Sequence, residues 1–100
     1  MGLGRVFGGG ASEAVPVLAV KGQVGECLGA SGAFQALAML GAMETAELPD
    51  IAGLGVVDPA IAATGLDFGP GPRQKDIRRG LVTGVGLDGQ VCALVIEQPR

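Results

Sequence analysis

Apolar residues dominate the chain in blocks that glycine and proline separate, with little strict alternation of hydrophobic and polar positions. Residues 15–20 read Val-Pro-Val-Leu-Ala-Val, which is typical of a strand covered on both faces. Residues 26–47 predict a long helix that ends before Pro49. Because residues 27–43 are apolar on all sides, we expect this helix to be buried.

Glycines cluster where this helix begins, at positions 25, 29 and 32. Each glycine inside a helix costs about 1 kcal/mol relative to alanine. Close packing of another element against Gly25, Gly29 and Gly32 is the physical reason we expect for them.

The second half of the chain predicts a long excursion followed by a hairpin. Residues 48–79 lose any periodic pattern, apart from one helical turn expected near residues 60–64. Residues 80–86 and 91–97 are apolar runs joined through an Asp-Gly pair, which predicts two antiparallel strands with a two-residue turn. The order β-α-(long loop)-β-β places the chain in the α/β class, as a single partial domain over residues 1–100.

Composition predicts that this domain is marginal on its own. The chain is 48% hydrophobic and 17% charged, which argues against disorder, but it has 19 glycines and only three aromatic residues. A chain of this length buries only ~60–70% of its unfolded surface. We therefore expect another chain to complete its apolar surface.

Charge and residue types exclude several classes of function. A net charge of −3 provides no electrostatic footprint for nucleic acid. The chain has no histidine, and Cys27 and Cys92 are too few and too far apart for a zinc site, so we expect neither a metal nor a cofactor. The first residues lack a secretory pattern, which predicts a cytoplasmic protein with reduced thiols, although a disulfide between the two cysteines stays open.

A membrane role is not expected either. The apolar run 27–43 lies at the short end of the ~17–25 residues that span a bilayer. It consists largely of alanine and glycine, and Glu26 and Glu44 flank it in place of basic anchors.

Two further motifs have ordinary explanations. Residues 73–79 carry four basic side chains and Asp76, which we interpret as a solvated approach to the next strand. Residues 84–89 spell Gly-Val-Gly-Leu-Asp-Gly, the dinucleotide fingerprint, but a strand follows where that fingerprint needs a helix. We interpret them as a glycine-rich hairpin.

The block Lys-Gly-Gln-Val-Gly-Glu-Cys-Leu-Gly-Ala-Ser-Gly-Ala at residues 21–33 resembles the β-ketoacyl synthases, the condensing enzymes of fatty acid and polyketide synthesis. Their C-terminal segment reads Lys-Ser-x-x-Gly-His-Leu-Leu-Gly-Ala-Ala-Gly-Ala. Residues 5–8, Leu48-Pro49, Asp58-Pro59 and residues 84–94 give weaker support over most of the chain. The resemblance implies a thiolase-like C-terminal half-fragment with one buried central helix.

The resemblance also implies candidate site residues. In active members a cysteine nucleophile takes the acyl chain from an acyl carrier protein, while histidine or asparagine donors hold the thioester carbonyl during decarboxylation. Lys21 matches the lysine of the family, and it either orders the site or pairs with Glu26. Gly84, Gly86 and Gly89 fall in the glycine-rich, substrate-binding hairpin of the family.

Departures from the family pattern argue against catalysis by this chain alone. Glu26 stands where the family has a histidine, and an ionised carboxylate would repel the enolate oxygen. Only a protonated, buried Glu26 could donate to that oxygen. Neither Cys27 nor Cys92 lies in a nucleophile context, and the phenylalanines of the family hairpin are missing. Such losses resemble the non-catalytic chain length factors of ketosynthase heterodimers.

Three hypotheses follow from the sequence. The first is a degenerate, accessory ketosynthase-like subunit that a ketosynthase-like partner or a second copy completes, with an acyl carrier protein as a further candidate partner. The second is the C-terminal part of an active synthase, with Lys21 and Glu26 in the working site. The third is a small self-associating α/β protein without acyl chemistry.

Overall fold

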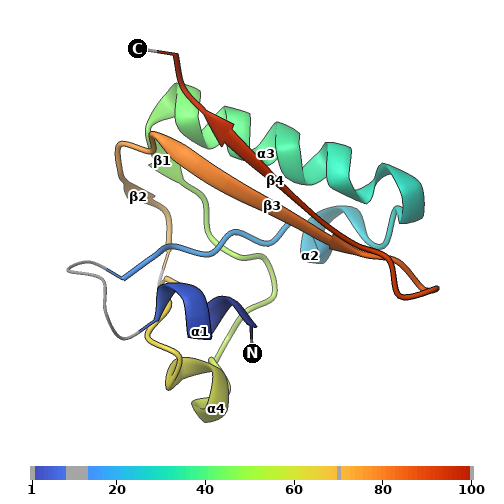
Figure 1. Ribbon diagram of the computed structural model, residues 1–100. Helices are drawn as coiled ribbons and strands as arrows, with labels where there is room; N and C mark the ends of the chain where they lie inside the picture. Colours follow the sequence, from blue (N-terminus) through green and yellow to red (C-terminus); the bar gives the residue numbers. More distant parts are fainter. Residues whose placement is uncertain (1, 9–13, 70, 100) are drawn as a thin grey trace.

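The computed structural model describes residues 2–8, 14–69 and 71–99. One long helix lies along a two-stranded antiparallel hairpin, and shorter segments lie below them in Figure 1, which confirms a small α/β arrangement. In chain order the elements are α1 (Gly2–Phe7), α2 (Lys21–Val24), the 3₁₀ turn η1 (Leu28–Ala30), α3 (Ser31–Thr45), β1 (Glu47–Leu48), α4 (Pro59–Ala62), β2 (Arg73–Gln74), β3 (Arg79–Val85) and β4 (Val91–Glu97).

The long helix α3 is shorter than the helix predicted over residues 26–47. Gly25 and Leu28 have φ values of 73° and 48°, in the left-handed region that a right-handed helix excludes. The chain therefore breaks into α2 and η1 before α3 begins. At the other end, Ala46 has a φ of 55° and stops the helix in a left-handed cap.

The expected burial of this helix is wrong for the described chain. Ala42 and Met43 on α3 are only 4% and 6% exposed, but Leu37 and Leu40 are 64% and 49% exposed. The hairpin covers one side of α3, and no described segment covers the opposite side. An apolar helix face without a neighbour remains open to water whatever its hydropathy.

The predicted hairpin is confirmed, whereas its two-residue turn is wrong. The register runs from Arg79 opposite Glu97 to Val85 opposite Val91. Beyond the strands, the Gly86 N–H donates to the Gln90 carbonyl at 2.7 Å, which leaves a three-residue loop. Gly89 adopts a φ of 86° inside that loop, a conformation that glycine accepts without strain.

The strand predicted at residues 15–20 does not form. This segment is extended, but it makes only an isolated parallel bridge between Pro16 and Asp67. The Val17 N–H donates to the Asp67 carbonyl at 2.8 Å, and the Asp67 N–H donates to the Val15 carbonyl at 2.9 Å. A strand requires a neighbour along its length, and the described chain provides one at a single point.

The excursion over residues 48–79 contains more structure than the sequence predicts. Its helical turn is α4, where the Asp58 side chain accepts from the Ala60 N–H and Pro59 occupies the first turn. β2 pairs antiparallel with β1, so that Gln74 lies opposite Glu47. The long excursion therefore folds back onto the end of α3.

Close backbone approaches occur at other glycines than those expected. A Cβ added at Gly25, Gly29 or Gly32 would meet nothing within 4 Å. At Gly22, in contrast, it would collide with the Ala52 carbonyl, and at Gly8 with that of Thr64. The glycines at the start of the long helix therefore face open space in this structure.

Very little of the described chain is fully buried. Only Ala42, Met43 and Leu48 are buried among the described residues, and each keeps 3–6% of its surface exposed. The accessible surface is 7075 Å², whereas a folded monomer of this mass exposes about 5,200 Å². The structure thus supports the prediction of a marginal domain with uncovered apolar surface.

Gln98 fastens the hairpin to the buried end of α3. Its Nε2 donates to the Met43 carbonyl at 3.0 Å and to the Ile77 carbonyl at 2.9 Å. The first of these carbonyls lies in the last turns of α3, and the second precedes β3. A single half-buried amide thereby joins the helix to both ends of the hairpin sequence.

We predict that Gln98→Ala lowers the free energy of unfolding by about 1–3 kcal/mol, because both acceptor carbonyls lose their partner. Urea denaturation followed by circular dichroism measures the change. Gln90→Ala is the matched control: it lies in the exposed hairpin turn and keeps the backbone carbonyl that accepts from Gly86. Equal stability of the two variants would contradict this role for Gln98.

Candidate functional site

Lys21 and Glu26, the two candidate catalytic residues, lie together at the start of the long helix. Lys21 Nζ donates to Glu26 Oε2 at 2.5 Å. The other oxygen, Glu26 Oε1, accepts from the Leu28 N–H and from Ser31 Oγ, each at 2.8 Å. The carboxylate therefore satisfies donors of η1 and of the first residue of α3, where a negative charge stabilises a helix.

These hydrogen bonds keep Glu26 ionised. The hydrogen bond from Lys21, followed by those from Ser31 and Leu28, lowers the pKa of Glu26 from 4.5 to about 2. The side chain is 52% exposed, so burial does not offset these bonds. The alternative of a protonated, donating Glu26 is wrong near neutral pH, where this group acts only as an acceptor.

Of the two interpretations left open for Lys21, ion pairing with Glu26 is confirmed. The Lys21 side chain is itself 58% exposed at the end of the 15–20 segment. A part in ordering a catalytic site stays a prediction. The pairing nevertheless accounts for a lysine at this position without any chemistry.

The three candidate glycines Gly84, Gly86 and Gly89 lie in the hairpin, and each has a conformational explanation. A Cβ at Gly84 would come within 3.2 Å of the Cys92 sulfur on the opposite strand. A Cβ at Gly86 would come within 2.8 Å of Asp88 Oδ1, and Gly89 needs its positive φ. Because β4 follows the motif directly, the dinucleotide interpretation is excluded. Substrate binding by these glycines stays a prediction.

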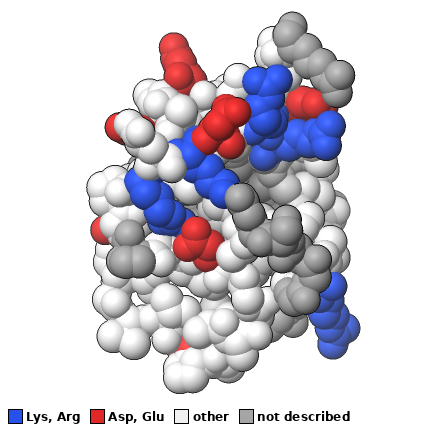
Figure 2. All heavy atoms as spheres, turned by 90° about the vertical axis from the view of Figure 1, so that its left-hand side faces the viewer, with Lys and Arg blue, Asp and Glu red and all other residues white. Residues whose placement is uncertain are grey.

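The basic segment 73–79 is partly neutralised by acidic neighbours. Arg73 Nη2 lies 2.5 Å from Asp67 Oδ2, and Arg79 Nε lies 3.2 Å from Glu97 Oε1. Burial raises the pKa of Asp67, but hydrogen bonds from the Gly69 N–H and Arg73 outweigh it and hold this pKa below its ordinary value. Figure 2 shows Lys and Arg side chains gathered with acidic ones on the side where Figure 1 draws β1 and β2. This arrangement agrees with a solvated, ion-paired approach to β3.

Cys27 and Cys92 are both free thiols, so the disulfide that the sequence left open does not form. Cys27 Sγ lies 3.6 Å from the Val24 carbonyl and is half-buried, while Cys92 is exposed on β4. In the described ranges, no group of three or more His, Cys, Asp and Glu residues could hold a metal ion. Searching the same ranges finds no helix both long enough and apolar enough to cross a membrane.

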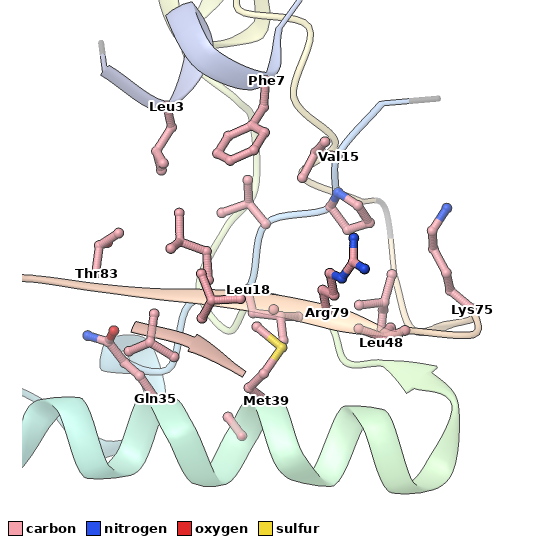
Figure 3. A pocket seen from close by; sticks show the side chains of 18 of the residues that line it. Leu3, Phe7, Val15, Leu18, Gln35, Met39, Leu48, Lys75, Arg79 and Thr83 are labelled. Atoms are coloured by element: carbon pink, nitrogen blue, oxygen red, sulfur yellow. The ribbon is translucent and has the colours of Figure 1, made fainter. Parts of the chain in front are cut away.

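The sequence does not predict a cavity of about 510 Å³ that the structure contains. The extended 15–20 segment, residues 75–83 and parts of α1 and α3 line it. Figure 3 shows Leu3 and Phe7 pointing into it from α1, and Gln35 and Met39 from α3. Residues remote in sequence form this cavity, so that no local motif signals it.

A scan against protein-family models matches residues 1–54 to the beta-ketoacyl synthase C-terminal domain. The chain belongs to the β-ketoacyl synthase family. The match includes Lys21, Glu26 and the whole of α3, and it ends before the hairpin. No curated protein and no solved structure matches the chain.

Membership connects the chain to the condensing enzymes of fatty acid and polyketide synthesis. The helix-and-hairpin arrangement is consistent with a thiolase-like C-terminal domain. Within this ketosynthase segment, Glu26, which the resemblance predicts to stand at the family histidine position, is an anion bound to the start of the helix. The structure thus gives Glu26 a role in folding that the family residue does not predict.

We predict that Lys21→Met raises the pKa of Glu26 from about 2 back toward 4.5, because Lys21 is the largest cause of the lowering. Carbon-13 NMR of the Glu26 carboxyl group measures this pKa directly. Ser31→Ala should raise the pKa less, since its hydrogen bond ranks second. An unchanged Glu26 titration in Lys21→Met would contradict the ion pair.

The same shift predicts the pH dependence of stability. Because the folded pKa lies below the ordinary value, ionised Glu26 stabilises the fold fully above pH 4.5, and this contribution is lost as the pH falls through about 2. Glu26→Gln should remove this part of the acid dependence. Urea midpoints across that pH range measure it.

Proposed function

We propose that this chain is an accessory, non-catalytic ketosynthase-like subunit that a ketosynthase-like partner chain completes. The observation that carries the proposal is the state of Glu26. Condensation develops negative charge on an enolate oxygen, which needs positioned hydrogen-bond donors. Glu26 places an ionised acceptor at the family's donor position, and its hydrogen bonds are already used by α3 and η1.

The uncovered surface supports the partner part of this proposal. The described chain exposes apolar side chains on α3 and on both strands of the hairpin, including Leu37, Val85 and Val91. Its surface exceeds that of a folded monomer by an amount on the order of 2,000 Å². Obligate interfaces bury 2,000–5,000 Å² over two partners, roughly the scale of this excess.

The second candidate function is the C-terminal part of an active synthase, and the match to the family over residues 1–54 favours it. In that case Lys21 and Glu26 would lie in the working site. Substitutions at these residues would then change the turnover of the assembled enzyme. Substitutions in a structural subunit would leave that turnover unchanged. An acyl carrier protein is a partner under either function. A small self-associating protein would bind neither an acyl carrier protein nor a ketosynthase.

We predict that the chain forms a defined heteromer with any ketosynthase that is encoded beside it. Native mass spectrometry of the chain, expressed alone and together with that ketosynthase, measures the assembly. A complex of fixed stoichiometry supports the accessory subunit. A folded chain that keeps its own mass beside the ketosynthase would overturn it, and a homo-oligomer alone would favour the self-associating protein.

We also predict that Glu26→His leaves the condensing activity of the complex within about twofold of the wild type, because Glu26 holds the helix start and not the substrate. A several-fold change in turnover would instead place this position in catalysis. Glu26→Gln is the matched control for the lost charge. Circular dichroism of both variants verifies that α3 is retained.

A further inference from the structure

The cavity of about 510 Å³ is lined by residues of β3 and of the extended 15–20 segment. In Figure 3, β3 runs across the middle of the view, with α1 above it and α3 below. Leu3 and Phe7 point down into the cavity, and Met39 points up into it. The cavity is therefore a slot between two helices that has extended backbone along two sides.

The edge of β3 on the side away from β4 carries unpaired backbone groups. The Gly86 N–H donates to the Gln90 carbonyl, and the Gln98 N–H donates to the Arg78 carbonyl. These two bonds identify which opposite residues form the hydrogen-bonded pairs of the antiparallel ladder. By this alternation, the N–H and C=O groups of Arg79, Leu81 and Thr83 point away from β4. Among the described residues β3 has β4 as its only neighbour, so these groups have no strand partner.

The 15–20 segment presents a second edge of this kind. Val15 and Val17 direct their backbone groups toward Asp67. Extended backbone alternates in direction, so Leu18 directs its own groups to the opposite edge. Both Leu18 and β3 line the cavity.

These edges decide which kind of occupant fits. A hydrocarbon chain would cover the apolar side chains but would leave buried backbone donors and acceptors unpaired, which costs free energy. An extended peptide covers the apolar side chains and also pairs the backbone groups, because it adds ladder hydrogen bonds to the edge and side chains to both faces. Its side chains would meet Phe7 on one face and Met39 on the other, which favours apolar, β-branched residues.

The positive charge beside the cavity indicates which type of residue stands at one end of such a strand. Arg78 directly precedes β3 and lines the cavity, whereas Arg79 already pairs with Glu97. We propose that the cavity receives an extended, β-branched strand of the partner chain, which pairs with the free edge of β3 and places a carboxylate beside Arg78. This inference rests on the proposed completion by a partner and names what that partner inserts.

A synthetic peptide tests the inference on the full chain. The probe is fluorescein-Glu-Val-Thr-Val-Ile-Val-Gly-Lys-Lys-amide, and its control has proline in place of the second of the three valines. Fluorescence anisotropy measures binding, and hydrogen exchange by NMR reports the protection of single amides. We expect saturable binding with at least about tenfold slower exchange at Leu81 and Thr83, because their N–H groups become ladder donors.

Two proline variants form a matched pair, since Thr83 and Ala93 lie opposite each other in the hairpin. Both residues direct their N–H groups outward from the ladder, Thr83 toward the cavity edge and Ala93 toward the outer edge of β4. We expect Thr83→Pro to weaken peptide binding about tenfold or more and Ala93→Pro to leave it within about twofold. Equal effects of the two variants would overturn the proposed register.

The other outcomes also decide the question. No saturation by the peptide, or binding without protection at Leu81 and Thr83, overturns strand insertion. Binding of dodecanoate in place of the peptide, with these amides still exchanging, would identify an anionic amphiphile as the occupant. A heteromer in native mass spectrometry together with a failed peptide test would reject this inference alone, whereas strand binding without a heteromer would reject the proposed function.

Discussion

The packing of α3 against β3 is the contact on which the rest of the structure depends. Gly80 on β3 has no side chain, and Met39 of α3 lies in the space that a Cβ there would need. The three buried residues lie at the end of α3 or directly after it, at Ala42, Met43 and Leu48. The other segments attach to this small core and expose most of their own apolar surface.

The two ends of α3 are held by different physical means. Glu26 holds its start through hydrogen bonds of a carboxylate to Leu28 and Ser31, with Lys21 supplying the counter charge. Gln98 holds its end through two neutral hydrogen bonds to backbone carbonyls. The first of these arrangements also fixes the chemistry of the site, because the same bonds that secure the helix keep Glu26 an anion.

Predictions from sequence succeeded where the determining interactions are local. The hairpin follows from two apolar runs around Asp88 and Gly89, and its turn length differed because the left-handed Gly89 belongs to a three-residue loop. The 15–20 segment has the composition of a covered strand, yet it bridges Asp67 alone because no other described segment lies along it. The cavity beside β3 had no signal in the sequence, since distant segments build it.

The sequence by itself determined the class of fold, the hairpin, the relationship to the ketosynthases and the presence of a carboxylate within the block that resembles them. These depend on residue identity and on the conformations of short segments. Only the tertiary structure decided that Glu26 is an ionised helix anchor, that α3 is covered on one side and that β3 has a free edge beside a cavity. Ionisation, burial and strand pairing depend on the neighbours that surround a group, and folding brings those neighbours from distant parts of the chain.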